Sequence, residues 1–426
     1  MMKGKLILIL ILASFLNEAI AQHAIIDEYL RSEDYCKLNQ YLANKNSKLD
    51  DFQRNYLTAI VLYAYNKPHE SNKIIEIILS DFSSGLTDSL CLRLQIMQAI
   101  NSVKLFEYEK ARSCTELVLS KYSHIMSNEK IADLRNNKII WTALSSIPAQ
   151  TSTIKRDVSV MLKRDFAGLL NVNVNFENGN EENFIFDTGA NFSVVRESVA
   201  IKNKWKIIKA GFEVGSSTGA KVKSDIAIAD SIVIAGSVFR NVVFLLFSDK
   251  DLTIKPLPLV KYNIMGIIGL PVIMEFGEIE IHSNGQLTIP KSLSKRNHRN
   301  FALPEFMPIV YVQLHNDTLG FHFDTGARKT SLTKRYLDTY PVTTNEKETT
   351  KTVGGAGGTK QVAIVELDEL KLSLAGKVAT IEDVPIRLEQ RHDKRNIYGN
   401  LGQDFLKQFK LVRINFDSMF IELEDD

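Results

Sequence analysis

Two short segments of this chain each carry a single aspartate inside an otherwise apolar, strand-like stretch. They are FIFDTGANFSVV at residues 184–195 and FHFDTGARKTSL at residues 321–332, and they place Asp187 and Asp324 at a separation of 137 positions (324 − 187 = 137). A carboxylate inside an apolar strand costs free energy unless it is paired or used. The fold must therefore give both aspartates a partner or a task, and each is a candidate partner for the other.

The two aspartates open longer units that repeat. A glycine turn follows each: GSSTG at 215–219, 28 positions after Asp187 (215 − 187), and VGGAGG at 353–358, whose Gly354 lies 30 positions after Asp324 (354 − 324). The segments IMGIIGLPVI and NIYGNLGQDFL come next, and the hairpin patterns EIEIHSNGQLTI and LVRINFDSMFIEL close the units. Runs rich in Val, Ile, Phe and Thr between Gly and Asn predict β-strands. One Asp-Thr-Gly arises readily by chance, but this ordered duplication does not.

The duplication sets the predicted domain boundaries. We expect two β units at residues 158–290 and 301–426, joined by the basic, polar linker KSLSKRNHRN at 291–300. Residues 22–150 differ, because Gly and Pro are few and apolar residues recur at spacings of three and four, which predicts helices. Two stretches of this region align at a period of 40, with Ser71 matching Ala111 (111 − 71 = 40).

Paired helices at a fixed period indicate an α-solenoid, and such repeats present a concave surface suited to a protein partner or substrate. The region is loosely similar to tetratricopeptide repeats, although it lacks their Trp and Gly. An irregular helical bundle fits the same pattern.

The first 21 residues have the three parts of a secretory signal peptide. Lys3 and Lys5 precede the apolar run Leu6–Leu16, and Ala19-Ile20-Ala21 offers small residues for cleavage before Gln22. An uncleaved N-terminal anchor has a similar pattern, so both alternatives stay open. No later segment is apolar for long enough to span a bilayer. We therefore expect an exported protein, periplasmic or extracellular, without an integral span after signal removal.

Charge and cysteine content limit the classes of partner and cofactor that the sequence indicates. The 52 basic and 50 acidic residues balance, so nothing indicates a nucleic-acid partner. Cys36, Cys91 and Cys114 fit either one disulfide with a free thiol or three buried thiols. No residues have the spacing of a zinc site or of a cysteine nucleophile. We expect neither a metal nor a cofactor.

These motifs resemble the aspartic proteases, and the retroviral (retropepsin) branch more than pepsin. Asp-Thr-Gly-Ala at 187–190 and 324–327 has Ala where pepsins usually have Ser, and VGGAGGTKQV resembles the glycine-rich retropepsin flap. IIG (267–269) and NLG (400–402) resemble the hydrophobic-hydrophobic-Gly turn that braces the active-site loop, with Asn400 departing from it. The resemblance covers residues ~158 to 426. It implies an α+β multidomain chain, in which an all-α helical repeat region precedes an all-β, bilobal aspartic-protease fold.

The resemblance also assigns roles. Asp187 and Asp324 would share a proton, activate a water and hydrolyse a peptide bond, and one chain would suffice because it holds both copies. Thr188 and Thr325 would cross-link the two loops. Gly189 and Gly326 would allow tight turns, and Ala190 and Ala327 would lie beneath the substrate. The residues expected to close over a peptide as flaps are Gly215, Ser216, Ser217, Thr218, Gly219, Gly354, Gly355, Ala356, Gly357 and Gly358.

The leading hypothesis is thus an aspartic endopeptidase that acts on peptides or proteins. The alternative is a non-catalytic peptide- or protein-binding module that uses the helical repeats and the space between the lobes. The presence of both aspartates favours the enzyme, since a binding module has no need of a paired carboxylate.

Overall fold

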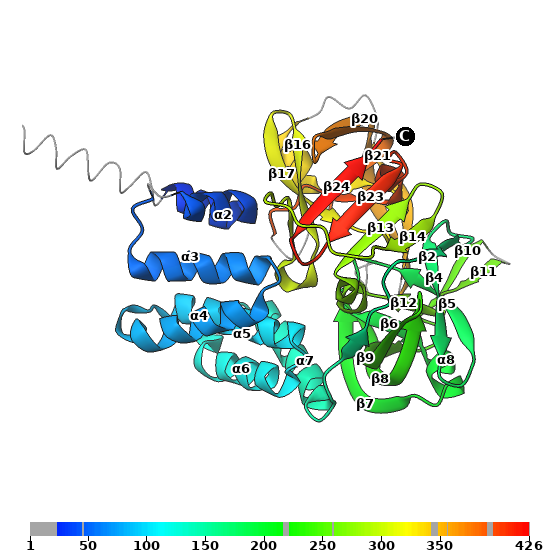
Figure 1. The fold of residues 1–426 in the computed structure, drawn as a ribbon, viewed down its shortest axis with the longest axis horizontal. Helices are drawn as coiled ribbons and strands as arrows, with labels where there is room; N and C mark the ends of the chain where they lie inside the picture. Colours follow the sequence, from blue (N-terminus) through cyan, green and yellow to red (C-terminus); the bar gives the residue numbers. More distant parts are fainter. Residues whose placement is uncertain are drawn as a thin grey trace, which may run out of the picture.

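A computed structural model describes residues 24–44, 47–215, 221–257, 260–341, 348–355, 357–389 and 395–425. A helical region occupies residues 24–144, and strands dominate from Thr151 onward. Figure 1 shows the helices stacked on one side of the β-rich part. The predicted order, an all-α region followed by an all-β, two-lobed part, is confirmed. Within the described ranges, no helix is long and apolar enough to cross a membrane.

The helical region consists of short antiparallel helices. Residues 24–32 are helical, and the labelled helices after them are α2 (Tyr35–Ala43), α3 (Asp51–Ala64), α4 (Pro68–Asp81), α5 (Asp88–Lys104), α6 (Tyr108–Lys121) and α7 (Asn128–Leu144). Side chains of Asp50, Thr87 and Ser127 cap the N-termini of α3, α5 and α7 by accepting a backbone N–H three residues ahead. Pro68 occupies the first turn of α4, where its missing N–H costs nothing.

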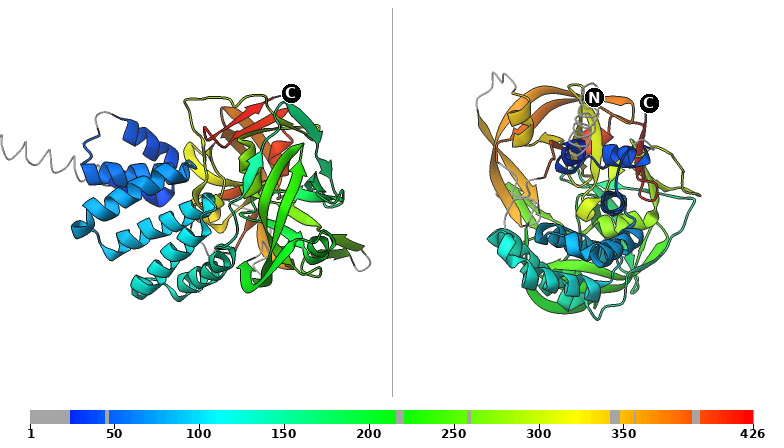
Figure 2. Two further views of the ribbon diagram at one scale, coloured as in Figure 1. Left: turned by 60° about the horizontal axis from the view of Figure 1, so that its bottom comes forward. Right: turned by 90° about the vertical axis from the view of Figure 1, so that its left-hand side faces the viewer.

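The helices recur at the period seen in the sequence. Helix α6 starts 40 residues after α4 (108 − 68), and α7 starts 40 residues after α5 (128 − 88). The short 3₁₀ turns η1 (Ser83–Gly85) and η2 (Ser123–Ile125) repeat with them. Ser71 and Ala111 are both fully buried at the matched positions, which lets neighbouring helices approach closely. Figure 2 shows the resulting layers. The likeness to tetratricopeptide repeats stays a prediction.

The first β lobe is built on a nine-stranded sheet. Its order is β1-β9-β6-β12-β5-β4-β8-β7, with β3 on β4 and a further β8–β9 pairing. The strands are β1 (Thr151–Thr153), β3 (Lys163–Arg164), β4 (Leu170–Phe176), β5 (Glu181–Phe186), β6 (Ser193–Arg196), β7 (Lys206–Gly215), β8 (Lys221–Ile234), β9 (Ser237–Phe247) and β12 (Gly266–Ile268). The lobe also holds the hairpin β10 (Thr253–Leu257)–β11 (Val260–Asn263) and the turns α8 (Glu197–Lys202), α9 (Leu270–Ile273) and η3 (Met274–Phe276).

The second lobe repeats that circuit in an eight-stranded sheet, ordered β15-β16-β17-β22-β18-β21-β20-β19. Its elements are β15 (Phe301–Ala302), η4 (Pro304–Phe306), β16 (Ile309–Leu314), β17 (Asp317–Phe323), β18 (Ser331–Leu332), α10 (Lys334–Thr339), β19 (Thr349–Gly355), β20 (Gly358–Leu374), β21 (Lys377–Arg387), β22 (Gly399–Leu401) and α11 (Gln403–Leu406). Strand β12 lies parallel to β5 and antiparallel to β6, and β22 has the same relation to β17 and β18. The internal repeat of the sequence is therefore a repeat of topology.

A separate five-stranded sheet joins the lobes, in the order β2-β14-β13-β23-β24. Its strands are β2 (Val158–Met161), β13 (Glu278–His282), β14 (Gln286–Ile289), β23 (Leu411–Asn415) and β24 (Phe420–Glu424). The seam is the β13–β23 ladder, in which Glu278 lies opposite Asn415. These two residues occupy equivalent places in the repeat, each 91 positions after its aspartate (278 − 187 and 415 − 324).

The helical region contacts both lobes. On the second lobe, Leu303 N–H donates to the carbonyl of Ala64 at 2.7 Å, and Tyr311 donates to the carbonyl of Glu33 at 2.7 Å. The buried Lys104 ammonium donates to the carbonyls of Tyr63 and Leu303 at 3.1 and 2.7 Å. On the first lobe, α7 packs against β7. All three cysteines are free thiols, so the alternative with a disulfide is wrong. The alternative of three buried thiols is correct for Cys114 alone, because Cys36 and Cys91 are half-buried.

Candidate active site

The two Asp-Thr-Gly loops meet face to face between the lobes. Strands β5 and β17 deliver them, and Thr188 and Thr325 join them: each threonine N–H donates to the hydroxyl of the other, at 3.0 and 3.1 Å. Each hydroxyl in turn donates to a carbonyl of the opposite strand, Thr188 to Phe323 at 3.0 Å and Thr325 to Phe186 at 2.7 Å. Both threonines are buried. The four hydrogen bonds hold the loops in a reciprocal arrangement.

Each glycine of the motif lies against the carboxyl group of the opposite loop. A Cβ on Gly189 would come within 2.6 Å of Asp324 Cγ, and one on Gly326 within 2.2 Å of Asp187 Cγ. Only glycine allows this approach. Gly189 N–H also donates to Asp187 Oδ1, and Gly326 N–H to Asp324 Oδ1, both at 2.8 Å. The structure therefore brings the two aspartates together, with matched hydrogen bonds on each side.

The surroundings of Asp187 favour its protonated form. Burial, the negative charge of Asp324 and a hydrogen bond with that carboxyl group raise the pKa of Asp187 well above its ordinary 3.8, against the opposing effect of the Gly189 and Ala190 amides. Two close carboxylates cannot both ionise readily, and a pair of this kind favours retention of one proton. The arrangement can therefore offer one acid and one base at the same place.

A second layer braces each loop from behind, and sequence reasoning missed part of it. Asp187 N–H donates to the carbonyl of Ile268, and Asp324 N–H to that of Leu401, both at 3.0 Å. The hydroxyls of Ser193 and Thr330 accept the N–H groups of Gly269 and Gly402 at 3.1 and 3.0 Å. Each hydroxyl stands six positions after its aspartate (193 − 187 and 330 − 324), and this matched spacing was a signal available in the sequence.

The departure at Asn400 has a local explanation. Asn400 pairs with His322 across β17 and β22, where His322 Nδ1 and Asn400 Oδ1 are 2.8 Å apart. The equivalent pair in the first lobe is Ile185 with Ile267, which is apolar. One lobe thus uses a hydrogen-bonded polar pair where the other uses an apolar one. His322 lies in β17, and its ring nitrogen is used in this pair.

The predicted flaps are equivalent hairpins in the two lobes, β7–β8 and β19–β20. In the first, Gly215 ends β7, whereas Ser216, Ser217, Thr218 and Gly219 lie outside the described residues. In the second, Gly355 pairs with Gly358, and Gly357 N–H donates to the carbonyl of Asp251 in the first lobe at 2.8 Å, while Gly354 packs on Ile254. Ala356 also lies outside the described residues. This hairpin tip therefore bridges the lobes.

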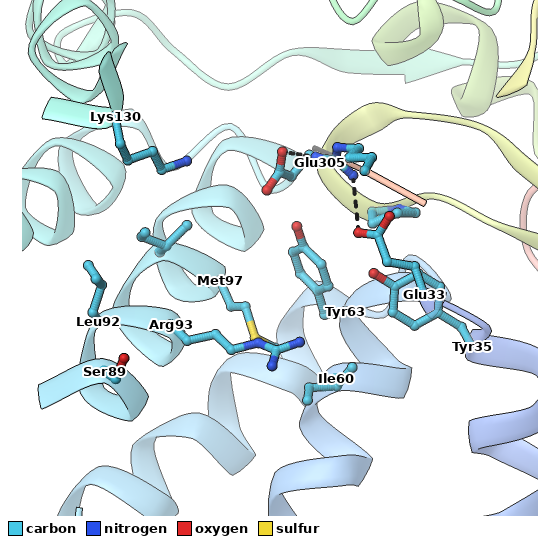
Figure 3. Close-up of a pocket in the computed structure, with 13 residues that line it drawn as sticks. Glu33, Tyr35, Ile60, Tyr63, Ser89, Leu92, Arg93, Met97, Lys130 and Glu305 are labelled. Carbon is cyan, nitrogen blue, oxygen red and sulfur yellow. Dashed lines mark hydrogen bonds and ion pairs between the residues drawn. The ribbon is translucent and has the colours of Figure 1, made fainter. Parts of the chain in front are cut away.

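A cavity of about 320 Å³ lies elsewhere, between the helical region and the second lobe. Figure 3 shows Arg93, Tyr63 and Glu305 among the side chains that line it. Arg395 pairs there with Glu305 and, at 3.8 Å, with Glu33. The cavity lies at the interface between the helical region and the second lobe and is separate from the two aspartates. Among the residues that the structure describes, no group of three or more His, Cys, Asp or Glu could hold a metal ion.

Comparison with known families agrees with this geometry. The family described as aspartyl protease matches residues 171–272 and 310–405. The match falls on both lobes. It covers each Asp-Thr-Gly loop together with the β12 and β22 strands that brace them, and the helical region lies outside it. The fold and the family match indicate a protease. No curated protein matches the chain.

Proposed function

We propose that the protein is an aspartic endopeptidase that uses Asp187 and Asp324 as one catalytic pair. The observation that carries the proposal is the reciprocal packing of the two loops, in which Gly189 and Gly326 each lie against the opposite carboxyl group. Loops that merely capped turns would not need a buried threonine cross-link to hold two carboxyl groups in contact.

In the proposed mechanism the pair holds one proton. The ionised carboxylate accepts a proton from a water molecule, and the resulting nucleophile attacks the carbonyl carbon of the peptide bond. The protonated carboxyl group donates to the carbonyl oxygen as negative charge develops there. The carboxyl group that took the water's proton then passes it to the departing amine as the C–N bond breaks. The hydroxyl formed from the carbonyl oxygen returns its proton to the other carboxylate as the C=O bond forms again, which restores the pair. The raised pKa of Asp187 beside Asp324 supports a proton held by the pair.

Peptides or proteins are the proposed substrates, and one chain suffices because both loops belong to it. Export completes the proposal and rests on the sequence of residues 1–21, which lie outside the described part of the chain. N-terminal sequencing of the protein recovered from a fractionated host would test it. A mature chain that begins near Gln22 is expected, and an intact N-terminus in the membrane fraction would contradict cleavage.

The catalytic pair is tested by substitution in the full chain. We expect Asp187→Asn and Asp324→Asn each to lower kcat on a peptide library by at least about 10²–10⁴-fold, because Asn can neither share the proton nor become the base. The double variant should be no worse than either single one, since the two residues act as a unit. The wild-type activity should be pepstatin-sensitive. Near wild-type kcat in either single variant would refute the proposal.

Mixing the two single variants is the control for exchange between chains. Continued inactivity supports one site in each chain, whereas recovered activity would show that lobes of different chains combine. If the wild-type protein binds peptides of the library without cleaving any of them, the non-catalytic binding module is the correct description.

A further inference from the structure

The outer edge of the first-lobe hairpin is occupied by the helical region. Strand β7 is the last strand of its sheet, so one side of its backbone has no strand neighbour in the part of the chain that the structure describes. Exposed edges of this kind leave N–H and C=O groups unpaired. Helix α7 lies along this edge, and its contact with β7 is the main one between the helices and the first lobe.

Asn136 of α7 makes a two-point contact with the edge. Its Nδ2 donates to the carbonyl of Glu213 at 2.5 Å, and its Oδ1 accepts the Glu213 N–H at 2.8 Å. The side-chain amide therefore satisfies both backbone groups of one residue, as a neighbouring strand would. Glu213 stands two residues before Gly215, where β7 ends. The contact is thus close to the tip of the hairpin.

The same helix also reaches the active-site loop. The ring of Trp141 packs on Phe192 with centroids 6.1 Å apart, and Tyr108 stacks on the other side of Trp141 at 6.2 Å. Phe192 stands two residues after Ala190, the last residue of the motif. Its backbone fills the space that a Cβ on Gly269 would need, 2.6 Å from the carbonyl carbon. Helix α7 therefore contacts both the hairpin and the loop that carries Asp187.

The equivalent hairpin of the second lobe, β19–β20, is supported from a different side. The first four residues of β19 are exposed, and the tip of its hairpin rests on Asp251 and Ile254 of the first lobe instead. The asymmetry is physical: one hairpin is tied to the helical region and the other to the opposite lobe. The contact with α7 fixes only one of the two equivalent hairpins. It therefore comes from the helical region and not from the duplicated β unit.

We propose that Asn136 is a positioning residue for the β7–β8 hairpin, and that α7 thereby sets how readily this hairpin opens for a peptide substrate. The proposal rests on the proposed function, since it takes the hairpin to cover the substrate. Opening the hairpin requires the two Asn136–Glu213 hydrogen bonds to break or α7 to move with it. This contact gives a partner bound to the helical repeats a route by which to act on peptide binding.

The first test measures the hairpin itself, without any activity. Hydrogen exchange is followed in the full-length Asn136→Ala variant at the amides of β7, and we expect about tenfold faster exchange at Glu213 and its neighbours, since two hydrogen bonds are lost. Asn137→Ala is the matched control, because Asn137 is also half-buried on α7 and has no side-chain hydrogen bond among the described residues. Equal exchange in both variants would overturn the proposal.

The second test measures the consequence for substrate. Loosening the hairpin should raise KM for a peptide several-fold in Asn136→Ala while kcat changes by less than about twofold, because the catalytic pair is untouched. Asn136→Asp supplies a rescue. Its carboxylate cannot donate to the Glu213 carbonyl, but its protonated form can, so KM relative to wild type should return toward one as pH falls below about 4.

The outcomes separate the two proposals. Faster exchange in Asn136→Ala with no peptidase activity in any variant, wild type included, would keep the positioning role and reject the proposed function. Wild-type activity with unchanged KM in Asn136→Ala would keep the function and reject the positioning role. A KM for Asn136→Asp that stays high at all pH values would show that the donor at residue 136 is not what matters, and would also reject it.

Discussion

Asp187 shows how a single residue couples the chemistry of a site to the stability of the fold. Its loop places it in a partly buried position beside a second carboxyl group, and this environment raises its pKa well above 3.8. The folded protein therefore retains a proton that the unfolded chain releases as the pH rises. Stability contributed by this proton is fully present below the unfolded pKa and is lost as the pH rises through the folded pKa.

This sign leads to a prediction for Asp187→Asn. The Asn side chain does not titrate, so the variant should gain stability relative to wild type as the pH rises above the ordinary Asp pKa of 3.8. Urea unfolding at several pH values measures the difference. Asp187 is only partly buried, which limits the size of the effect through solvent screening. A stability difference that stays constant over this pH range would contradict the assignment.

At the scale of elements, the sheet between the lobes depends on a buried polar cluster at one crossing. The carboxylate of Glu278 is fully buried and accepts from Asn415 Nδ2 at 2.5 Å, from Ser294 N–H at 2.7 Å and from Ser294 Oγ at 2.9 Å. Arg413 approaches it at 3.4 Å. The cluster joins β13, β23 and the predicted linker, so it ties the two lobes at the point where their repeats meet.

Removing the carboxylate should be costly. Glu278→Ala leaves several buried donors and part of the Arg413 charge without a partner, and we expect the free energy of unfolding to fall by about 3–5 kcal/mol. Chemical denaturation measures it. Glu424→Ala is the control, because this glutamate ends β24 of the same sheet and is mostly exposed, with an expected change below about 0.5 kcal/mol. A loss for Glu278→Ala as small as that of the control would mean that the cluster does not hold the lobes together.

At the scale of the whole molecule, the helical region packs against the two β lobes. Lys104 shows an energetic cost of the interface between the helical region and the second lobe. Its ammonium is buried between α5, α3 and that lobe. Burial lowers its pKa to about 7, and the charge of Glu305 opposes this only in part. Between pH 7 and 10.5 the unfolded chain thus binds a proton that the folded protein has released.

The folded protein should accordingly become more stable in alkaline solution. Since the unfolded state binds more protons between pH 7 and 10.5, Lys104 makes the free energy of unfolding rise over that window. Lys104→Met should remove this contribution, so its stability relative to wild type should decline as the pH increases. Thermal unfolding from pH 6 to 10 tests the slope, with the exposed Lys130→Met as control. Parallel curves for Lys104→Met and wild type would contradict the lowered pKa.

The sequence by itself determined the order of the regions and the pairing of two Asp-Thr-Gly loops, because duplication leaves equal spacings that need no coordinates. It also contained the equal spacings of Ser193 and Thr330 from their aspartates. These spacings match only when Ser and Thr are compared as hydroxyl side chains. Local patterns of this kind survive in one dimension because each depends on neighbours along the chain.

Only the tertiary structure decided how the parts meet. The Asn136–Glu213 contact joins residues 77 positions apart, and the Lys104–Leu303 contact joins residues 199 apart. A lone Asn on a helix and a lone Lys at a helix end have no pattern that marks them, because their partners are backbone groups that every residue possesses. The physical reason is that packing brings a particular backbone group to a particular side chain, and sequence spacing carries no record of that choice.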